Sequence, residues 1–195
     1  MEINKRSNTL YLDLSLHMTG YCATIYKRNK FEILASGIIP NNIATSRESH
    51  IRTMFTALSI LNLIDTLNIK RLVIEDYAFS KFAQSRAISC LAEIRGALNF
   101  ITMATPDLKI ETVAPNTSIK SLTGIGKYKS RDEKKAATIK AATKLMHHLF
   151  NGGITTRKDT IVDDNEADAI ALFHYDRSSD LHFHDKPLAL EKLEL

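Results

Sequence analysis

Three acidic residues of this 195-residue chain interrupt or end otherwise apolar segments. Asp13 lies within LYLDLSL, Glu75 ends LVIE, and Asp168 lies among alanines in EADAIAL. A carboxylate that leaves water is costly unless it is paired or binds a cation. Carboxylate oxygens suit Mg²⁺ and Mn²⁺, and two such ions can hold the attacking and leaving oxygens of a phosphodiester displacement. The alternative is that each acid caps a turn or forms a salt bridge.

The elements that must position these acids follow from the hydrophobic pattern. The pattern predicts strands at 9–15, 20–28, 31–38, 71–76 and 108–113. It predicts helices at 51–67, 81–105, 115–122, 132–150 and 164–175. This order indicates an α/β fold: a mixed sheet, made of an antiparallel three-strand meander plus parallel strands, with helices on both faces. If the first strand neighbours the 71–76 strand, Asp13 and Glu75 lie side by side, and the last helix can add Asp168.

Composition limits the class of protein. Hydrophobic residues make up 44% of the chain and charged residues 25%, which is typical of a folded domain and excludes a disordered chain. We expect one folded domain at 1–178 and a loosely ordered tail at 179–195. No apolar run is long enough to span a membrane. Cys22 and Cys90 lie in apolar runs, so we expect reduced thiols and a cytoplasmic location.

Four motifs in order resemble the RuvC family of Holliday junction resolvases, within the ribonuclease H-like superfamily. The first is Asp13 followed by Thr-Gly-Tyr at 19–21, and the second is a strand ending in Ile-Glu at Glu75. An Arg-Gly pair at 95–96 and a Gly-x-Gly at 124–126 come next. The last motif is an acid-rich helix that contains Asp168 followed by Ala-hydrophobic-Ala. The resemblance implies a ribonuclease H-like fold and a metal-dependent nuclease.

The last motif departs from the family pattern, which places an acid three residues before Asp168. This chain has Asn165 there. On a helix, Asp164 lies about 40° from Asp168 and Asn165 about 60° on the other side. We therefore expect Asp164 to be the fourth metal-binding carboxylate, with Asn165 as a neutral or outer-sphere ligand. The expected metal set is Asp13, Glu75, Asp164 and Asp168, which would hold two Mg²⁺ ions, with Mn²⁺ able to substitute.

A basic stretch follows the Gly-x-Gly motif, and it concentrates the modest net charge of +4. Such a cluster can neutralise DNA phosphates, although a solvated helix face is the alternative. The glycines would let a phosphate approach the backbone closely. By resemblance, Lys120 and one of Lys134 or Lys135 match basic residues near the cut site. We count Lys120 and Lys134 as catalytic, and the wider set as DNA-binding: Lys120, Lys127, Lys129, Arg131, Lys134 and Lys135.

Two further features come from the resemblance. Tyr77 and Phe79 follow Glu75, where relatives stack an aromatic ring on bases opened at the junction centre. The alternative is that these rings pack the loop onto the next helix. That helix carries Arg95, which we count as DNA-binding, and it is the expected dimer element. A C₂ dimer would supply two active sites for the paired cuts of a two-fold junction.

The sequence thus favours an endodeoxyribonuclease that resolves Holliday junctions and other branched DNA, leaving 5′-phosphate and 3′-hydroxyl ends. The expected partners are four-way junction DNA and a second copy of the chain. No membrane and no small-molecule cofactor are expected. Two alternatives remain: a ribonuclease H-like nuclease that acts on structured RNA, and a protein that binds junctions without cutting them.

Overall fold

A mixed five-stranded sheet forms the centre of the computed structural model, which describes residues 7–15, 17–27, 30–40, 49–76, 85–114, 116–153, 155 and 160–184. The strands are β1 (Thr9–Asp13), β2 (Met18–Lys27), β3 (Lys30–Pro40), β4 (Arg71–Glu75) and β5 (Lys109–Val113). Their order across the sheet is β3-β2-β1-β4-β5. The β1–β2 and β2–β3 pairs are antiparallel, whereas β1–β4 and β4–β5 are parallel. The predicted meander and parallel strands are confirmed.

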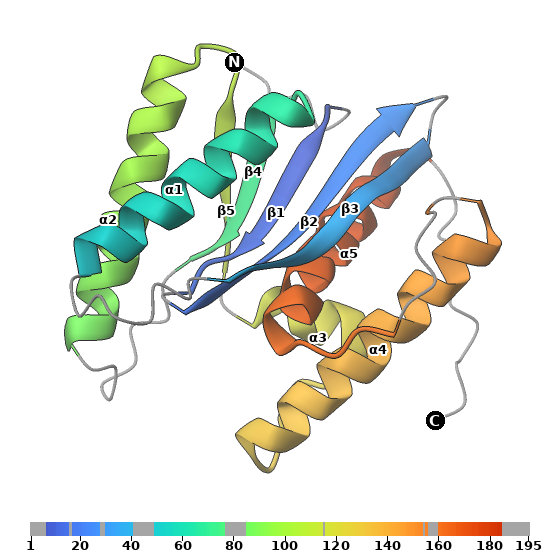
Figure 1. Ribbon diagram of the computed structural model, residues 1–195. Helices are drawn as coiled ribbons and strands as arrows, with labels where there is room; N and C mark the ends of the chain where they lie inside the picture. The colour runs from blue at the N-terminus through green and yellow to red at the C-terminus, as the bar shows by residue number, and fades with distance from the viewer. Residues whose placement is uncertain are drawn as a thin grey trace.

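Helices cover both faces of this sheet, as the sequence predicts (Figure 1). The helices are α1 (Ser49–Thr66), α2 (Ser85–Ala104), α3 (Thr117–Thr123), α4 (Arg131–Asn151) and α5 (Asp164–His184). Helices α1 and α2 lie on one face, and α3, α4 and α5 lie on the other. Within the described part of the chain, no helix combines the length and hydrophobicity needed to cross a bilayer.

Strand alternation divides the hydrophobic core into two layers, because successive side chains point to opposite faces. Leu10 and Leu12 pack with Ile60 of α1 and Leu98 of α2. Tyr11, between the two leucines, packs on the other face with residues of α4 and α5. Asp13 has the same parity as Tyr11, so β1 presents its terminal acid to the α5 face.

Most element boundaries differ from the predicted ones, usually by one or two residues, and the ends of β1 and α5 have a physical explanation. Strand β1 ends at Asp13, not at Ser15, because Ser15 instead closes a turn with Thr19: the Thr19 Oγ1 donates to the Ser15 carbonyl at 3.1 Å. Helix α5 continues to His184, so the predicted end at residue 175 is wrong. No Gly or Pro follows until Pro187, so nothing in the sequence stops the helix there. The division of the chain at residue 178 stays a prediction.

A buried ion-pair network ties α5 to the sheet. The Arg71 guanidinium, 1% exposed, donates to both oxygens of Asp176 on α5 at 2.7 and 2.8 Å. It also donates to both oxygens of Glu111 on β5 at 2.8 and 2.6 Å. The Tyr11 hydroxyl donates to Asp176 at 2.7 Å. The network therefore joins β1, β4, β5 and α5 at one point, and three of these elements carry the predicted acids.

Candidate active site

The first two acids lie side by side at one edge of the sheet. Strands β1 and β4 run parallel, and Leu12 pairs with Ile74. The next residues along, Asp13 and Glu75, therefore end adjacent strands at the same edge. Because both have the parity of Tyr11 and Val73, which pack against the α5 layer, both face α5. The predicted neighbourhood of these strands is confirmed.

Helix α5 begins beside this edge and carries the other two acids. Asp163 caps the helix: its Oδ1 accepts from the backbone N–H of Asn165 at 2.9 Å and of Glu166 at 3.3 Å. The first turn passes so close to β2 that a Cβ on Gly20 would lie 1.8 Å from the Asn165 carbonyl oxygen. Gly20 pairs with Asp13 across β1–β2. The glycine of the Thr-Gly-Tyr motif thus allows α5 to approach the acid on β1.

The four carboxylates repel one another electrostatically. Burial raises the pKa of Asp13 well above its ordinary value, and the charges of Asp168, Glu75 and Asp164 raise it further. Burial also raises the pKa of Glu75, and it raises that of Asp168 to about 7. Lys134 lowers all three pKa values. The effect of burial, with repulsion at Asp13 and Asp168, therefore exceeds that of Lys134, and a divalent cation would favour the ionised carboxylates.

Two of the carboxylates make direct contacts with protein groups. The Asp164 Oδ2 lies 2.5 Å from the Lys135 Nζ. The Glu75 Oε1 accepts from the backbone N–H of Asn116 at 2.7 Å. In the described residues, no three His, Cys, Asp or Glu side chains stand close enough to share one metal ion. The donor set itself, all carboxylate oxygens, fits Mg²⁺ or Mn²⁺.

The structure bears on the choice between Asp164 and Asn165. The Asp164 charge acts on both Asp13 and Asp168, so its carboxylate lies on their side of the helix. The Asn165 amide instead donates to the Asp163 Oδ1 at 3.1 Å. Asp164 therefore remains our candidate for the fourth ligand, and Asn165 is turned to the helix cap.

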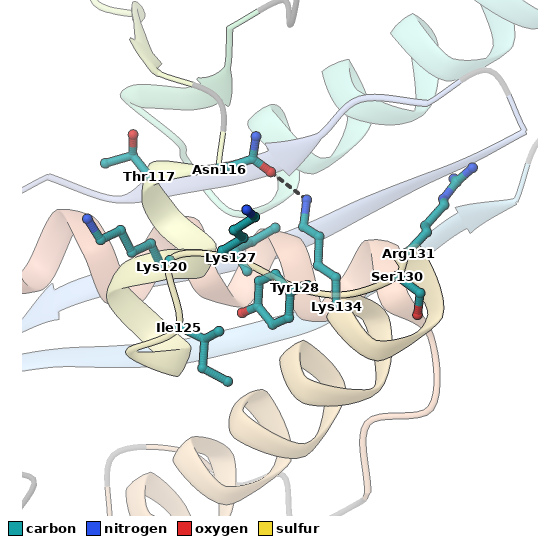
Figure 2. A pocket seen from close by; sticks show the side chains of 11 residues that line it. Asn116, Thr117, Lys120, Ile125, Lys127, Tyr128, Ser130, Arg131 and Lys134 are labelled. Carbon is teal, nitrogen blue, oxygen red and sulfur yellow. Dashed lines mark hydrogen bonds between the residues drawn. The ribbon is translucent and has the colours of Figure 1, made fainter.

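The predicted basic residues lie near the acids, in a neighbouring pocket or on the surface. Lys134 and Lys135 lie near the acids, as the pKa effects and the Lys135–Asp164 ion pair show. Lys120, Lys127 and Arg131 instead line a neighbouring pocket, which Lys134 also borders (Figure 2). Lys129 is exposed, and its backbone N–H donates to Glu133 at 2.6 Å.

The remaining predicted site residues lie after β4 or on α2. Arg95 forms an ion pair with Asp76, the residue after Glu75, at 2.9 Å. Its guanidinium thereby connects α2 to the end of β4. Tyr77 and Phe79 lie outside the described residues.

Sequence reasoning missed two residues that shape this region. Asn116 joins Glu75 to Lys134, because its N–H donates to Glu75 while its Oδ1 accepts from the Lys134 Nζ at 2.6 Å. Its φ of 60° is a left-handed conformation that Asn tolerates, and its place just before a helix was the available signal. Tyr128, in the connection between α3 and α4, borders the pocket. A single aromatic residue in a polar connection gives no signal of its own.

Comparison with known proteins identifies the family. The family model of crossover junction endodeoxyribonuclease RuvC matches residues 9–174. The chain belongs to the RuvC family. It is therefore an enzyme of the endodeoxyribonuclease class, and the predicted resemblance is confirmed. A comparison with individual curated protein sequences gives no significant match.

Solved resolvase structures share the RuvC fold of this chain. Thermus thermophilus RuvC in complex with Holliday junction substrate gives a TM-score of 0.62 at 14% identity, covering 87% of this chain and 92% of that one. The yeast mitochondrial Holliday junction resolvase gives 0.61 at 12% identity, covering 93% and 83%. The Fowlpox virus resolvase with Holliday junction DNA gives 0.55 at 14% identity, covering 88% and 98%. These likenesses confirm the ribonuclease H-like fold.

Proposed function

We propose that this RuvC-family enzyme is a metal-dependent nuclease that resolves Holliday junctions and related branched DNA by paired cuts. One observation carries the proposal: β1, β4 and α5 bring Asp13, Glu75, Asp164 and Asp168 within electrostatic reach of one another. Burial raises the pKa of Asp13, Glu75 and Asp168 although Lys134 lowers it, so a bound cation would favour their ionised forms. On a RuvC fold, this cluster is suited to hold two Mg²⁺ or Mn²⁺ ions.

The chain's own residues would prepare the scissile phosphodiester for attack. Divalent cations held by these acids would activate a water for attack and stabilise the leaving 3′-oxygen, giving 5′-phosphate and 3′-hydroxyl ends. Asn116 fixes both Glu75 and Lys134, so the carboxylate and the ammonium keep a set separation. Lys134 is placed to stabilise negative charge on the phosphate, and Lys120 supplies a second cation from the adjoining pocket.

A homodimer would provide the two active sites that paired cuts require. Helix α2 exposes Phe100 and Met103, which are 72% and 83% exposed. Gly96 lies one turn before Phe100 and two turns before Met103. A Cβ on Gly96 would meet no atom within 4 Å, so a partner helix has room to approach. The Arg95–Asp76 ion pair connects this helix to the residue beside Glu75. The predicted dimer element therefore has an exposed apolar face and a link to the site.

The test is cleavage of a synthetic four-way junction with Mg²⁺ or Mn²⁺, compared with linear duplex DNA and a structured RNA. Wild-type protein should make paired nicks near the branch point, and Asp13→Asn should make none. Asp107→Asn, which changes an 82% exposed acid outside the cluster, is the matched control and should cut normally. Preferential cleavage of RNA, or junction binding without product at any Mn²⁺ concentration, contradicts the proposal.

A further inference from the structure

A pocket of about 610 Å³ lies beside the acidic cluster, between α3, the 124–130 connection and the start of α4 (Figure 2). Asn116 and Lys134 form its border with the active site. The Lys134 Nζ donates to Asn116 at 2.6 Å, and the Asn116 N–H donates to Glu75 at 2.7 Å. A ligand in this pocket would therefore lie next to the scissile phosphate.

The chemistry of the pocket wall favours an anion. Lys120, Lys127, Arg131 and Lys134 contribute four positive charges, and no Asp or Glu lines the pocket. Its volume falls in the range of roughly 300–1,000 Å³ that accommodates organic ligands, so it is larger than one phosphate group requires. The pocket thus has room for a group attached to the anion.

The aromatic ring of Tyr128 contributes to the apolar part of the wall, together with Ile119 and Ile125. The Tyr128 hydroxyl and the Thr123 Oγ1 are 2.6 Å apart. Thr123 is itself fixed, since its hydroxyl donates to the Ile119 carbonyl at 2.8 Å and accepts from the Ile125 N–H at 3.2 Å. Tyr128 is therefore held in place before any ligand arrives. Aromatic rings bind bases of any sequence by stacking, provided the base face is free.

We propose that this pocket binds one unpaired nucleotide of the cleaved strand, next to the scissile phosphodiester. The base lies against Tyr128, and its phosphate lies near Lys127 and Lys134, which project between Lys120 and Arg131 (Figure 2). A paired base has both faces covered by its neighbours in the duplex, so only a nucleotide released at a branch point fits. The pocket then selects branched over linear DNA and influences which base stands beside the cut. This inference rests on the proposed function of the same site.

The test is a scan with the fluorescent base analogue 2-aminopurine, placed in turn at each position around the branch of a four-way junction. Binding is measured with the Asp13→Asn variant without divalent metal, so that the DNA stays intact. One position should change its fluorescence strongly on binding. Adding Tyr128→Ala should abolish that change and weaken junction binding about 10-fold or more. Tyr128→Phe, the matched control, keeps the ring and should retain most of the signal.

Lys127→Ala is a second variant, at an exposed residue, and it keeps the test informative if Tyr128→Ala does not fold. It should weaken the response at the same position. The inference is overturned if no position responds in the bound junction, or if both alanine variants leave the responding position unchanged. Absence of cleavage by wild-type protein would refute the proposed function instead, because the fluorescence scan does not depend on cutting.

Discussion

Replacing Asp168 by Asn should stabilise the metal-free protein while it abolishes cleavage. Folding moves the pKa of this carboxyl from 3.8 to about 7, chiefly through burial. A shift of one pKa unit corresponds to about 1.36 kcal/mol. The ionised side chain therefore destabilises the native state by about 4 kcal/mol above pH 7. Asn is neutral and similar in shape, so the variant avoids this cost.

The sign of the pH dependence follows from proton binding. Between about pH 4 and pH 7, the native state holds a proton on Asp168 that the unfolded chain has lost, so the free energy of unfolding falls as pH rises. Below about pH 4 both states are protonated, and wild type and Asp168→Asn should be equally stable. Above pH 7 the variant should melt roughly 8–16 °C higher. The raised pKa values of Asp13 and Glu75 also make the free energy of unfolding fall as pH rises, both in wild type and in the variant.

The assay is thermal unfolding between pH 4 and pH 8 in the presence of a chelator, with Asp107→Asn as the exposed control. Adding Mg²⁺ at pH 8 should then raise the melting temperature of wild type more than that of Asp168→Asn, because a ligand that binds the native state stabilises it. A wild-type melting temperature that does not fall from pH 4 to pH 8, or a variant less stable than wild type at pH 8, would refute this reasoning.

Two further substitutions test how the acids are positioned. Gly20→Ala places a methyl group 1.8 Å from the Asn165 carbonyl, so β2 and α5 must separate. We expect a loss of about 3 kcal/mol in chemical denaturation and about 100-fold in cleavage rate, and wild-type values would contradict the close contact. Arg71→Met leaves the buried Asp176 carboxylate without its cation, and it should cost about 3–5 kcal/mol in urea unfolding. Adding Asp176→Leu should recover part of that loss, and no recovery would argue against an unpaired charge as the cause.

Most of the fold was predictable because it depends on the alternation of apolar and polar residues within strands and on the order of strands and helices along the chain. The sequence LYLD places Leu10 and Leu12 on one face and Asp13 on the other, which the two core layers reproduce. The end of α5 was not predictable from its apolar pattern, because the residues after Tyr175 are largely polar. In this polar part of the helix, the Ser178 hydroxyl donates to the His174 carbonyl at 2.8 Å.

The positions of Asp13 and Glu75 at one edge of the sheet were predictable, whereas the groups that contact the acids were not. Asp13 and Glu75 end apolar runs, which is a local signal. Arg71, by contrast, meets Glu111 and Asp176 across 40 and 105 residues of sequence, and no spacing within one element indicates such a contact. The role of Asn116 depends on its backbone conformation, which composition does not reveal.

The placement of the acids along the chain has a consequence during protein synthesis. Domains acquire their structure as the ribosome releases them, with the N-terminal part first. A chain that stops before Asp164 contains the ends of β1 and β4 but lacks both acids of α5, together with the helix that covers their face of the sheet. Truncated products therefore have half of the cluster and an exposed core. We therefore expect nuclease activity to appear only after the last helix is complete.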